Sequence, residues 1–264
     1  MTRLSVKISL IIILGLYLPI QSMAWGQLGH RIVAEIANGY LTPKAKIEVA
    51  KILGTESLAI SSTWADFIRS DSNYKYLAQW HYIDFTGEMT LEKMSEQLET
   101  DTMVNAYTKL NFLIKQLRNK SLVQNEKQLY LRMLVHIVGD IHQPLHVSPR
   151  GDNGANSIKL NWFNDPSNLH RVWDENLIQY QELSYTEYVK AINFSSLSER
   201  AKWQKQAISE WLFESYSKSV EIRTQVKDGE KLGFVYNFKN IGTVNQQLLK
   251  AGVRLAGILN DIFK

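Results

Sequence analysis

The segment Leu134–His146 places three histidines and one aspartate among residues that otherwise have the apolar composition of a buried helix. Imidazole and carboxylate groups are costly to bury unless something pairs with them. His136 and Asp140 are four residues apart, so on a helix they project from nearly the same face. Pro144 cannot continue a helix, so the chain turns there and His146 can approach the first two side chains.

Two interpretations of this segment are open on its residues alone. An imidazole and a carboxylate on one face suit a zinc ion. The same pair could be a hydrogen-bonded network inside a core, and at this point the two interpretations are evenly balanced. His142 follows His136 by six residues, so it projects from another face of the helix.

The first residues have the pattern of a secretory signal peptide. Met1–Lys7 is a short basic region, residues 8–20 are almost continuously apolar, and Ser22-Met23-Ala24 has small residues at both specificity positions of a cleavage site. The apolar run is too short for a membrane span and no stop-transfer pattern follows, so an uncleaved anchor is the weaker alternative. We predict a signal peptide over 1–24, a mature domain over 25–264, export to the periplasm or the medium, and no membrane span after cleavage.

The mature chain restricts the chemistry that a metal site could use. Removing residues 1–24 from the 264 leaves 240, enough for one domain with a sizeable core. Arg3 and Lys7 leave with the signal peptide, so the formal charge falls from +4 to +2, and no broad electrostatic footprint for duplex DNA remains. The chain has no cysteine. Disulfides and thiolate zinc sites are therefore excluded, and metal ligands must be His, Asp, Glu or backbone groups.

The whole chain has only 5 prolines and 14 glycines, and helical periodicity dominates its predicted mature part. Single helices are predicted over 27–40, 43–53, 125–142, 197–226 and 241–263. The second of these has Thr42 as N-cap and Gly54 as C-cap. A short helix is predicted within 61–70, and one or two helices within 90–118. Residues 80–85 read as a short extended piece. Alternating Ile158, Leu160 and Trp162 predict a strand, residues 164–167 a turn, and 168–178 a returning strand followed by a helix. We expect a mostly α-helical single domain with a small β hairpin near residues 157–172.

Further candidate ligands lie outside the central segment. His170 and Asp174 repeat the spacing of His136 and Asp140. Cleavage before Trp25 would create a free α-amino group, which titrates at about 7.7–8.0 in model peptides. Together with the Trp25 carbonyl, this amine could chelate a metal, which would link metal loading to export.

Six motifs follow one another in order along the mature chain. They are Trp-Gly-x-x-Gly-His (25–30), Trp-Ala-Asp-x-x-Arg (64–69), Trp-His-Tyr-Ile-Asp (80–84), His-x-x-Gly-Asp-x-x-Gln-Pro-Leu-His (136–146), Gly-Asp-x-Gly-x-Asn (151–156) and Leu-His-x-x-Trp-Asp (169–174). With them the chain resembles the zinc-dependent type I nucleases, also called single-strand-specific nuclease/3'-nucleotidases. That family occurs in fungi, plants and bacteria and shares a fold with bacterial zinc-dependent phospholipase C.

The resemblance implies three zinc ions, nine ligand residues and a mostly helical nuclease fold. The first zinc would be held by Asp66, His81, His136 and Asp140, the second by Trp25 (amine and carbonyl), His30 and a bridging Asp140, and the third by His146, His170 and Asp174. No ligand role falls to His142, which we expect to pack in the core or to support a ligand.

Three zinc ions around a small cavity suit the hydrolysis of phosphodiesters. Zinc lowers the pKa of bound water toward about 7, so a hydroxide bridging the close pair could attack phosphorus in line while the third zinc stabilises the departing 3'-oxygen. Asp66 would also orient this hydroxide. Arg69 is one helical turn later, where its guanidinium could bind the phosphate oxygens; the alternative is a surface arginine.

The resemblance also implies a nucleobase site, in which Tyr82 stacks on the base, Asp84 accepts hydrogen bonds from it and Asn156 helps to shape the pocket. Stacking tolerates any base but requires it to be unpaired, which favours single-stranded DNA and RNA. The alternative for Tyr82 is a core aromatic.

Two features depart from the family's pattern. Ala155 stands where members usually have the second glycine of Gly-Gly-Asn, and it would be strained if that position takes a positive φ. Many relatives also use disulfides, which this chain lacks, so its stability would depend more on zinc.

These observations predict an exported zinc-dependent endonuclease that cleaves single-stranded nucleic acid to 5'-phosphorylated products and has 3'-nucleotidase activity. We expect a monomer, and no protein partner is implied. Zinc-dependent phospholipase C is the nearest alternative; the short Trp25–His30 spacing, Asp174 in place of glutamate, and the Tyr82 and Asp84 base site argue against it. A non-catalytic exported zinc-binding protein would leave Arg69 and Tyr82 unexplained.

Overall fold

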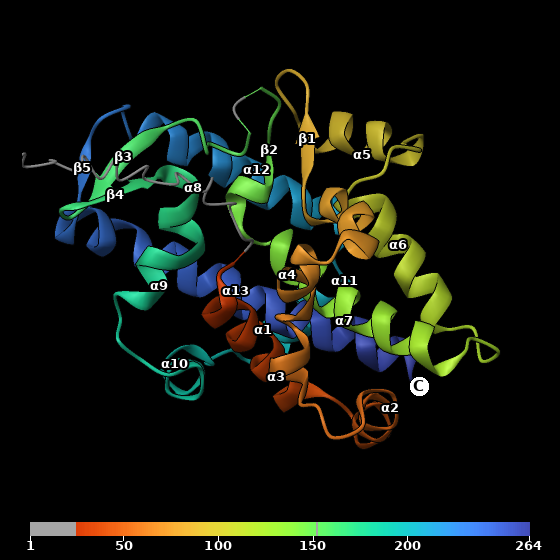
Figure 1. Ribbon diagram of the computed structural model, residues 1–264. Helices are drawn as coiled ribbons and strands as arrows, with labels where there is room; N and C mark the ends of the chain where they lie inside the picture. The colour runs from red at the N-terminus through yellow and green to blue at the C-terminus, as the bar shows by residue number, and fades with distance from the viewer. Residues whose placement is uncertain (1–24, 152) are drawn as a thin grey trace, which may run out of the picture.

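Three helices form the centre of the protein, which is mostly helical as predicted (Figure 1). The computed structural model describes residues 25–151 and 153–264; the predicted signal peptide lies outside this part of the chain. Helix α1 (Gln27–Tyr40) packs along α13 (Phe234–Ile262), and α7 (Gln124–Asp140) contacts both. Among the described residues, no helix combines the length and the apolar character needed to cross a membrane.

Shorter helical segments connect and cover these three. They are α2 (Pro43–Leu53), α3 (Leu58–Ser61), α4 (Trp64–Phe67), η1 (Ile68–Ser70), η2 (Ser72–His81), α5 (Leu91–Glu99), α6 (Ala106–Leu117), η3 (Pro144–His146), α8 (Leu169–Arg171), η4 (Val172–Asn176), α9 (Leu177–Gln179), α10 (Tyr185–Ile192), α11 (Leu197–Lys205) and α12 (Ile208–Thr224).

The first two helices begin and end where the sequence predicts. Helix α1 has the predicted bounds. At the start of α2, the Thr42 hydroxyl accepts a hydrogen bond from the amide of Ala45 at 3.2 Å. Gly54 follows its last turn with φ +67°, a conformation that favours glycine, so the predicted caps are confirmed.

Three predicted elements are wrong in their bounds. Residues 197–226 do not form one helix, because Gln206 and Ala207 are extended between α11 and α12. The side chain of Gln206 accepts a hydrogen bond from Arg254 at 2.6 Å, and such a distant partner leaves no local sequence signal. Helix α13 begins at Phe234 instead of residue 241. Of the extended piece expected at 80–85, only 83–85 is a strand, because the helical run η2 continues to His81.

The expected hairpin is present, with β3 (Lys159–Trp162) antiparallel to β4 (Asp165–Asn168). The reversal falls at residues 163–164, so most of the turn predicted at 164–167 belongs to β4. The returning strand expected to begin at residue 168 ends there instead, and α8 follows directly. Strand β5 (Lys231–Leu232) runs parallel to β3, a pairing that the sequence did not predict.

A second, unpredicted pair of strands brings two histidines together. Strand β1 (Ile83–Phe85) runs parallel to β2 (Val147–Pro149), with Ile83 opposite Val147. His81 lies just before β1 and His146 just before β2, so this register places them side by side. The Nδ1 of His146 is 2.7 Å from the carbonyl oxygen of His81.

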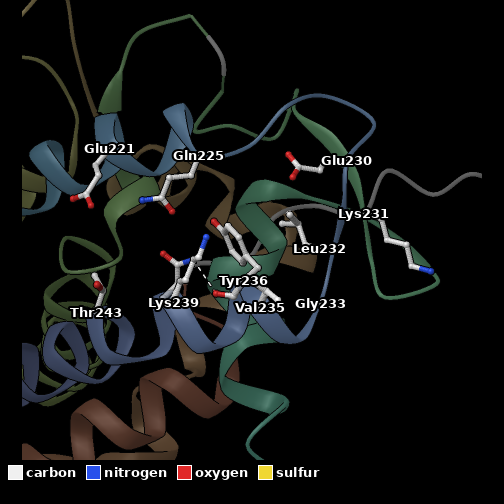
Figure 2. Close-up of a pocket in the computed structure, with 11 residues that line it drawn as sticks. Glu221, Gln225, Glu230, Lys231, Leu232, Gly233, Val235, Tyr236, Lys239 and Thr243 are labelled. Carbon is white, nitrogen blue, oxygen red and sulfur yellow. Dashed lines mark hydrogen bonds between the residues drawn. The ribbon is translucent and has the colours of Figure 1, made fainter.

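A polar hollow of about 500 Å³ lies between α12, β5 and the start of α13 (Figure 2). Glutamates and lysines line it in equal number: Glu221, Glu230, Lys231 and Lys239. The Tyr236 hydroxyl at its floor accepts a hydrogen bond from the Trp173 indole at 2.9 Å. Of the predicted site residues that the structure describes, none lines this hollow.

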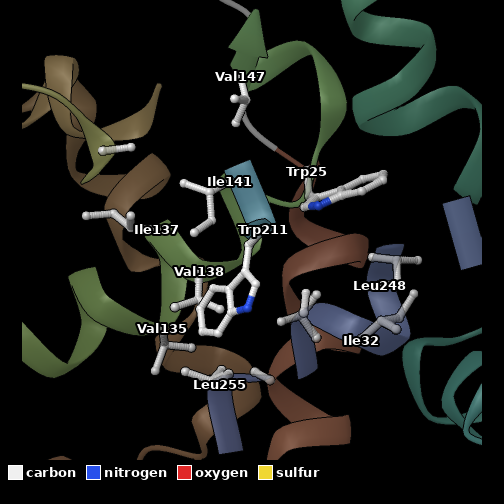
Figure 3. Close-up of a cluster of buried hydrophobic side chains, with 14 of the residues drawn as sticks. Trp25, Ile32, Val135, Ile137, Val138, Ile141, Val147, Trp211, Leu248 and Leu255 are labelled. Atoms are coloured by element: carbon white, nitrogen blue, oxygen red, sulfur yellow. The ribbon is translucent and has the colours of Figure 1, made fainter. Parts of the chain in front are cut away.

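The apolar core supports α7 from two sides. Val135 and Val138 of α7, each at most 1% exposed, lie near Trp211 of α12 and Ile32 of α1 (Figure 3). Trp211, Leu212 and Tyr216 of α12 are buried in the same core. A helix enclosed in this way is a rigid support for the polar side chains that it carries on its remaining face.

Candidate metal centre

The structure brings together all eight side chains predicted as metal ligands. Each is at most 7% exposed, and they form three groups within which one potential ligand atom per residue lies within 4.8 Å of the others. The groups are His30, Asp66 and His136; His81, His136 and Asp140; and His146, His170 and Asp174.

Asp140 belongs to the second group and also lies next to His30 of the first group. Its Oδ1 lies 3.3 Å from His30 Nε2, whereas its Oδ2 lies 3.0 Å from His81 Nδ1 and 3.3 Å from His136 Nε2. The two carboxylate oxygens thus face different histidines. This is the arrangement that a carboxylate bridging two metal ions requires.

Asp66 of the first group faces both His136 and Arg69. Asp66 Oδ1 is 3.8 Å from His136 Nε2 and 3.4 Å from the guanidinium Nη1 of Arg69. The Arg69 side chain remains 26% exposed, so it lies at the boundary between the buried cluster and solvent.

The third group is built around a local irregularity of the helix. His170 Nε2 lies 3.1 Å from His146 Nε2 and 3.1 Å from Asp174 Oδ2. Asp174 belongs to η4, a π-helical turn, and such turns often occur at functional sites. The amide of Gly26 donates to the Asp174 carbonyl at 2.8 Å, so the fully buried Trp25 also lies next to this group. Its amine would exist only after the predicted cleavage, so that ligand stays a prediction.

Backbone carbonyls orient three of the histidines. The Nδ1 atoms of His136, His146 and His170 lie 2.6–2.7 Å from the carbonyl oxygens of Ser62, His81 and Gly154, respectively. A proton on Nδ1 leaves Nε2 unprotonated and directed into the cluster, as metal ligation requires.

Two glycines make the close packing around the histidines possible. A Cβ at Gly139 would lie 2.8 Å from His30 Nδ1, so only glycine lets this ring approach α7. Gly154 has φ +63°, and a Cβ there would lie 2.9 Å from His170 Nδ1.

Ala155 continues the left-handed backbone of Gly154, with φ +64° and no exposed surface. The strain anticipated at this departure from the family pattern is therefore present, and it opposes the benefit of burying the methyl group.

We expect Ala155→Gly to leave the free energy of unfolding unchanged or to raise it by up to about 1 kcal/mol. Ala34→Gly, a buried control in α1, should lower it by about 1 kcal/mol. Chemical denaturation measures both, and equal losses in the two variants would contradict the strain.

Metal ions fit the cluster on the evidence of its unpaired polar atoms. Of the ten buried side-chain nitrogen and oxygen atoms without a hydrogen-bond partner among the described residues, five belong to these ligands: His30 Nδ1 and Nε2, Asp66 Oδ2, His81 Nε2 and Asp140 Oδ1. Such atoms are costly to bury alone. Bound cations would remove that cost for the atoms that ligate them.

Burial sets the protonation of the cluster. It lowers the pKa of His30 and His146, with neighbouring histidines adding to the effect, and it lowers the pKa of His81 to about 4. Burial also raises the pKa of Asp140 well above its ordinary value. For His170, burial lowers the pKa, but the Asp174 carboxylate more than offsets this and raises it. At neutral pH, three histidines are thus held neutral, the form that binds metals.

The residues predicted for base binding, Tyr82, Asp84 and Asn156, are all at least partly exposed. Tyr82 is 45% exposed, so it is not a core aromatic. Asp84 accepts a hydrogen bond from Ser148 at 3.2 Å. The amide of Asn156 donates to the Asn153 carbonyl at 2.8 Å, within its own loop. Their binding roles stay predictions.

Sequence reasoning missed one residue that contacts a ligand. The side chain of Gln143 donates to Asp174 Oδ1 and accepts from the amide of Leu145 at 2.6 Å. Gln143 lies within the motif that ends at His146, and its place in that motif was the sequence feature that could have identified it. His142 stays outside the cluster, as predicted.

The fold and this cluster define a mostly helical protein with a buried His/Asp centre that is able to hold several metal ions. A family model described as S1/P1 Nuclease matches residues 25–264, and the chain belongs to that family. It is therefore a nuclease, a hydrolase whose substrates are nucleic acids.

Individual relatives agree with this assignment. The chain is 28% identical to Endonuclease 3 of Arabidopsis thaliana, over 92% of this chain and 90% of that protein. It is 29% identical to Nuclease S1 of Aspergillus oryzae, over 67% of this chain and 63% of that protein. With Nuclease P1 of Penicillium citrinum it shares 29% identity over 70% of this chain and 66% of that protein.

Proposed function

We propose that this chain is an exported zinc-dependent endonuclease that hydrolyses single-stranded DNA and RNA to 5'-phosphorylated products and also dephosphorylates 3'-nucleotides. The observation that carries the proposal is Asp140, whose two oxygens face different histidines at the centre of the buried cluster. Such a centre suits zinc because every ligand is a nitrogen or an oxygen and the chain has no cysteine.

The family resemblance implies a ligand set for each zinc, drawn from the eight side chains that the structure brings together. Asp66, His81, His136 and Asp140 would hold the first. Trp25, His30 and Asp140 would hold the second, and His146, His170 and Asp174 the third. When bound, the zinc ions supply Lewis acidity and a water that ionises near neutral pH.

The chain's own groups would position the substrate. The Arg69 guanidinium lies 3.4 Å from Asp66 at the exposed edge of the cluster, where it can donate to the phosphate oxygens of a bound strand. Asp66 Oδ2, a buried atom without a partner, can ligate zinc or accept a hydrogen bond from the attacking water.

Tyr82 would hold an unpaired base beside the cleaved bond. Stacking of a base on an aromatic ring contributes about 1–3 kcal/mol. We therefore expect Tyr82→Ala to lower kcat/KM on single-stranded DNA by about 10- to 100-fold. Activity on bis(p-nitrophenyl) phosphate, which has no base, should be unchanged. Phe238→Ala removes an aromatic ring that is 84% exposed on α13 and serves as the control. An equal loss on both substrates would rule out base stacking as the role of Tyr82.

Incubation of the mature, secreted chain with denatured DNA tests the function directly. Release of acid-soluble, 5'-phosphorylated nucleotides that chelator abolishes and zinc restores is the expected result. No release from protein that contains close to three zinc ions would overturn the proposal, and phospholipids would then be the substrates to test.

A further inference from the structure

The turn formed by residues 141–145 joins two parts of the metal centre. Asp140 precedes it at the end of α7, and His146 follows it at the end of η3. Any movement of this turn would change the position of the third group relative to the bridging carboxylate. The turn is buried throughout.

Side chains of α12 and α13 hold the backbone of this turn. The Ser215 hydroxyl donates to the carbonyl of Ile141 at 2.6 Å. The side chain of Gln247 donates to the carbonyl of His142 at 2.8 Å. These bonds satisfy carbonyl groups just beyond the end of α7, where no further helical turn follows to supply amide donors.

The His142 side chain makes the third link to the same helices. Its Nδ1 lies 2.7 Å from the Val138 carbonyl, and its Nε2 lies 2.9 Å from the guanidinium Nη1 of Arg254. A guanidinium only donates hydrogen bonds, so Nε2 must accept, and Nδ1 carries the proton. His142 is the one histidine of the central motif that the metal sites do not use.

Arg254 has no exposed surface, although it carries a full positive charge. Its Nη2 donates to Glu214 at 2.9 Å and to Gln206 at 2.6 Å, and its guanidinium lies 5.2 Å from the centre of the Trp211 ring. Glu214 also accepts from Lys250 at 3.2 Å.

An ion pair between the buried Arg254 and Glu214, whose side chain is 29% exposed, contributes little net stability compared with apolar side chains of similar volume. Here it lies directly behind the turn and donates to a side chain of that turn. This geometry gives Arg254 a role in positioning the turn through its hydrogen bond to His142.

We propose that Arg254 and His142 are a positioning pair that fixes the turn between Asp140 and His146 and thereby sets the third metal group relative to the bridged pair. The inference rests on the proposed three-zinc centre. Gln143 extends the link within the same turn, because its side chain donates to Asp174 of the third group.

A double variant separates positioning from stability. The double variant His142→Phe/Arg254→Met removes the hydrogen bonds that both side chains make. It leaves no charged partner unpaired, because Glu214 keeps its ion pair with Lys250. We expect this variant to unfold within a few degrees of the wild type. Tyr188→Phe is the matched control, since it removes one hydrogen bond from α10 to the same helix α13, at 2.7 Å from Asn245, without touching the turn.

Zinc binding to the metal-free proteins is the first readout, measured by competition with a chromogenic chelator. We expect one of the three zinc ions to bind about tenfold or more weakly in the double variant and unchanged in the control. The kcat of the double variant on denatured DNA should fall by a similar factor, with KM unchanged. An unaltered zinc titration and an unaltered kcat in the folded double variant would overturn the proposal.

A milder variant covers the case in which the double variant does not fold. Gln247→Met removes the bond to the His142 carbonyl and leaves Arg254 in place. Weakened binding of one zinc supports the inference, and a lowered unfolding temperature with normal zinc binding contradicts it. A wild type that binds three zinc ions but cleaves no DNA would refute the proposed function alone, because the zinc titration does not depend on activity.

Discussion

Replacing Asp140 with asparagine is expected to abolish nuclease activity and, at the same time, to stabilise the metal-free protein. Asp140 is fully buried, and its two oxygens face His30 on one side and His81 and His136 on the other. An amide cannot bridge two cations with two anionic oxygens. We expect activity to fall by about 1000-fold or more, and the protein to lose at least one zinc.

The opposite effect on the metal-free protein follows from burial. Burial raises the pKa of Asp140 in the folded state above its unfolded value, which is about 3.9. Below the unfolded pKa, the protonated carboxyl favours the folded state. This contribution to the free energy of unfolding is lost as the pH rises through the raised folded pKa. At neutral pH without metal, Asp140 therefore destabilises the fold, and asparagine removes this penalty.

Thermal unfolding with and without chelator tests both halves of this prediction. Asp140→Asn should unfold at a higher temperature than the wild type in chelator and at a lower temperature in zinc. Asp165→Asn makes the same chemical change at an exposed position and should alter neither value. A variant that is less stable than the wild type in chelator would show that Asp140 has a structural role without metal.

The metal centre was predictable from sequence because its residues lie in short motifs with local geometry. His136 and Asp140 share a helix face at a spacing of four residues, and in the structure His136 Nε2 lies 3.3 Å from Asp140 Oδ2. The assignment of His30, His81 and Asp66 to the same centre came from the resemblance to a family, since no spacing connects them.

The features that were not predicted depend on partners far away in sequence. Strands β1 and β2 pair residues 83 and 147, and neither strand has more than three residues, too few for a periodic signal. At the break between α11 and α12, Gln206 accepts a hydrogen bond from Arg254, which lies 48 residues later in the sequence. The same arginine is the partner of His142, 112 residues away. Local patterns fix helices and their caps, whereas these contacts appear only once the whole chain has packed.

Removal of zinc should have the largest effect on stability. A site loaded at 1,000 times its dissociation constant stabilises a protein by about 4 kcal/mol, so three sites would contribute roughly 12 kcal/mol. For a domain of this size, this corresponds to a fall in unfolding temperature of about 20 °C or more. The chain has no cysteine, so no disulfide offsets the loss. Differential scanning calorimetry with and without chelator measures it.

Acid should remove the same stabilisation over a defined range. Burial holds the pKa of His81 at about 4 in the fold, below its ordinary 6.5, and it also lowers the pKa of His30 and His146. Because these folded values are depressed, the neutral side chains contribute stability that is present above pH 6.5 and is lost as the pH falls toward 4. Protons also compete with zinc for the same nitrogens. The difference in unfolding temperature between zinc-loaded and chelated protein should therefore begin to shrink as His170, whose pKa is raised, takes up a proton, and should shrink most steeply as the pH approaches 4, where His81 is protonated. A difference that stays constant down to pH 4 would mean that these histidines do not hold the zinc ions, because carboxylates of ordinary pKa would still be largely ionised at that pH.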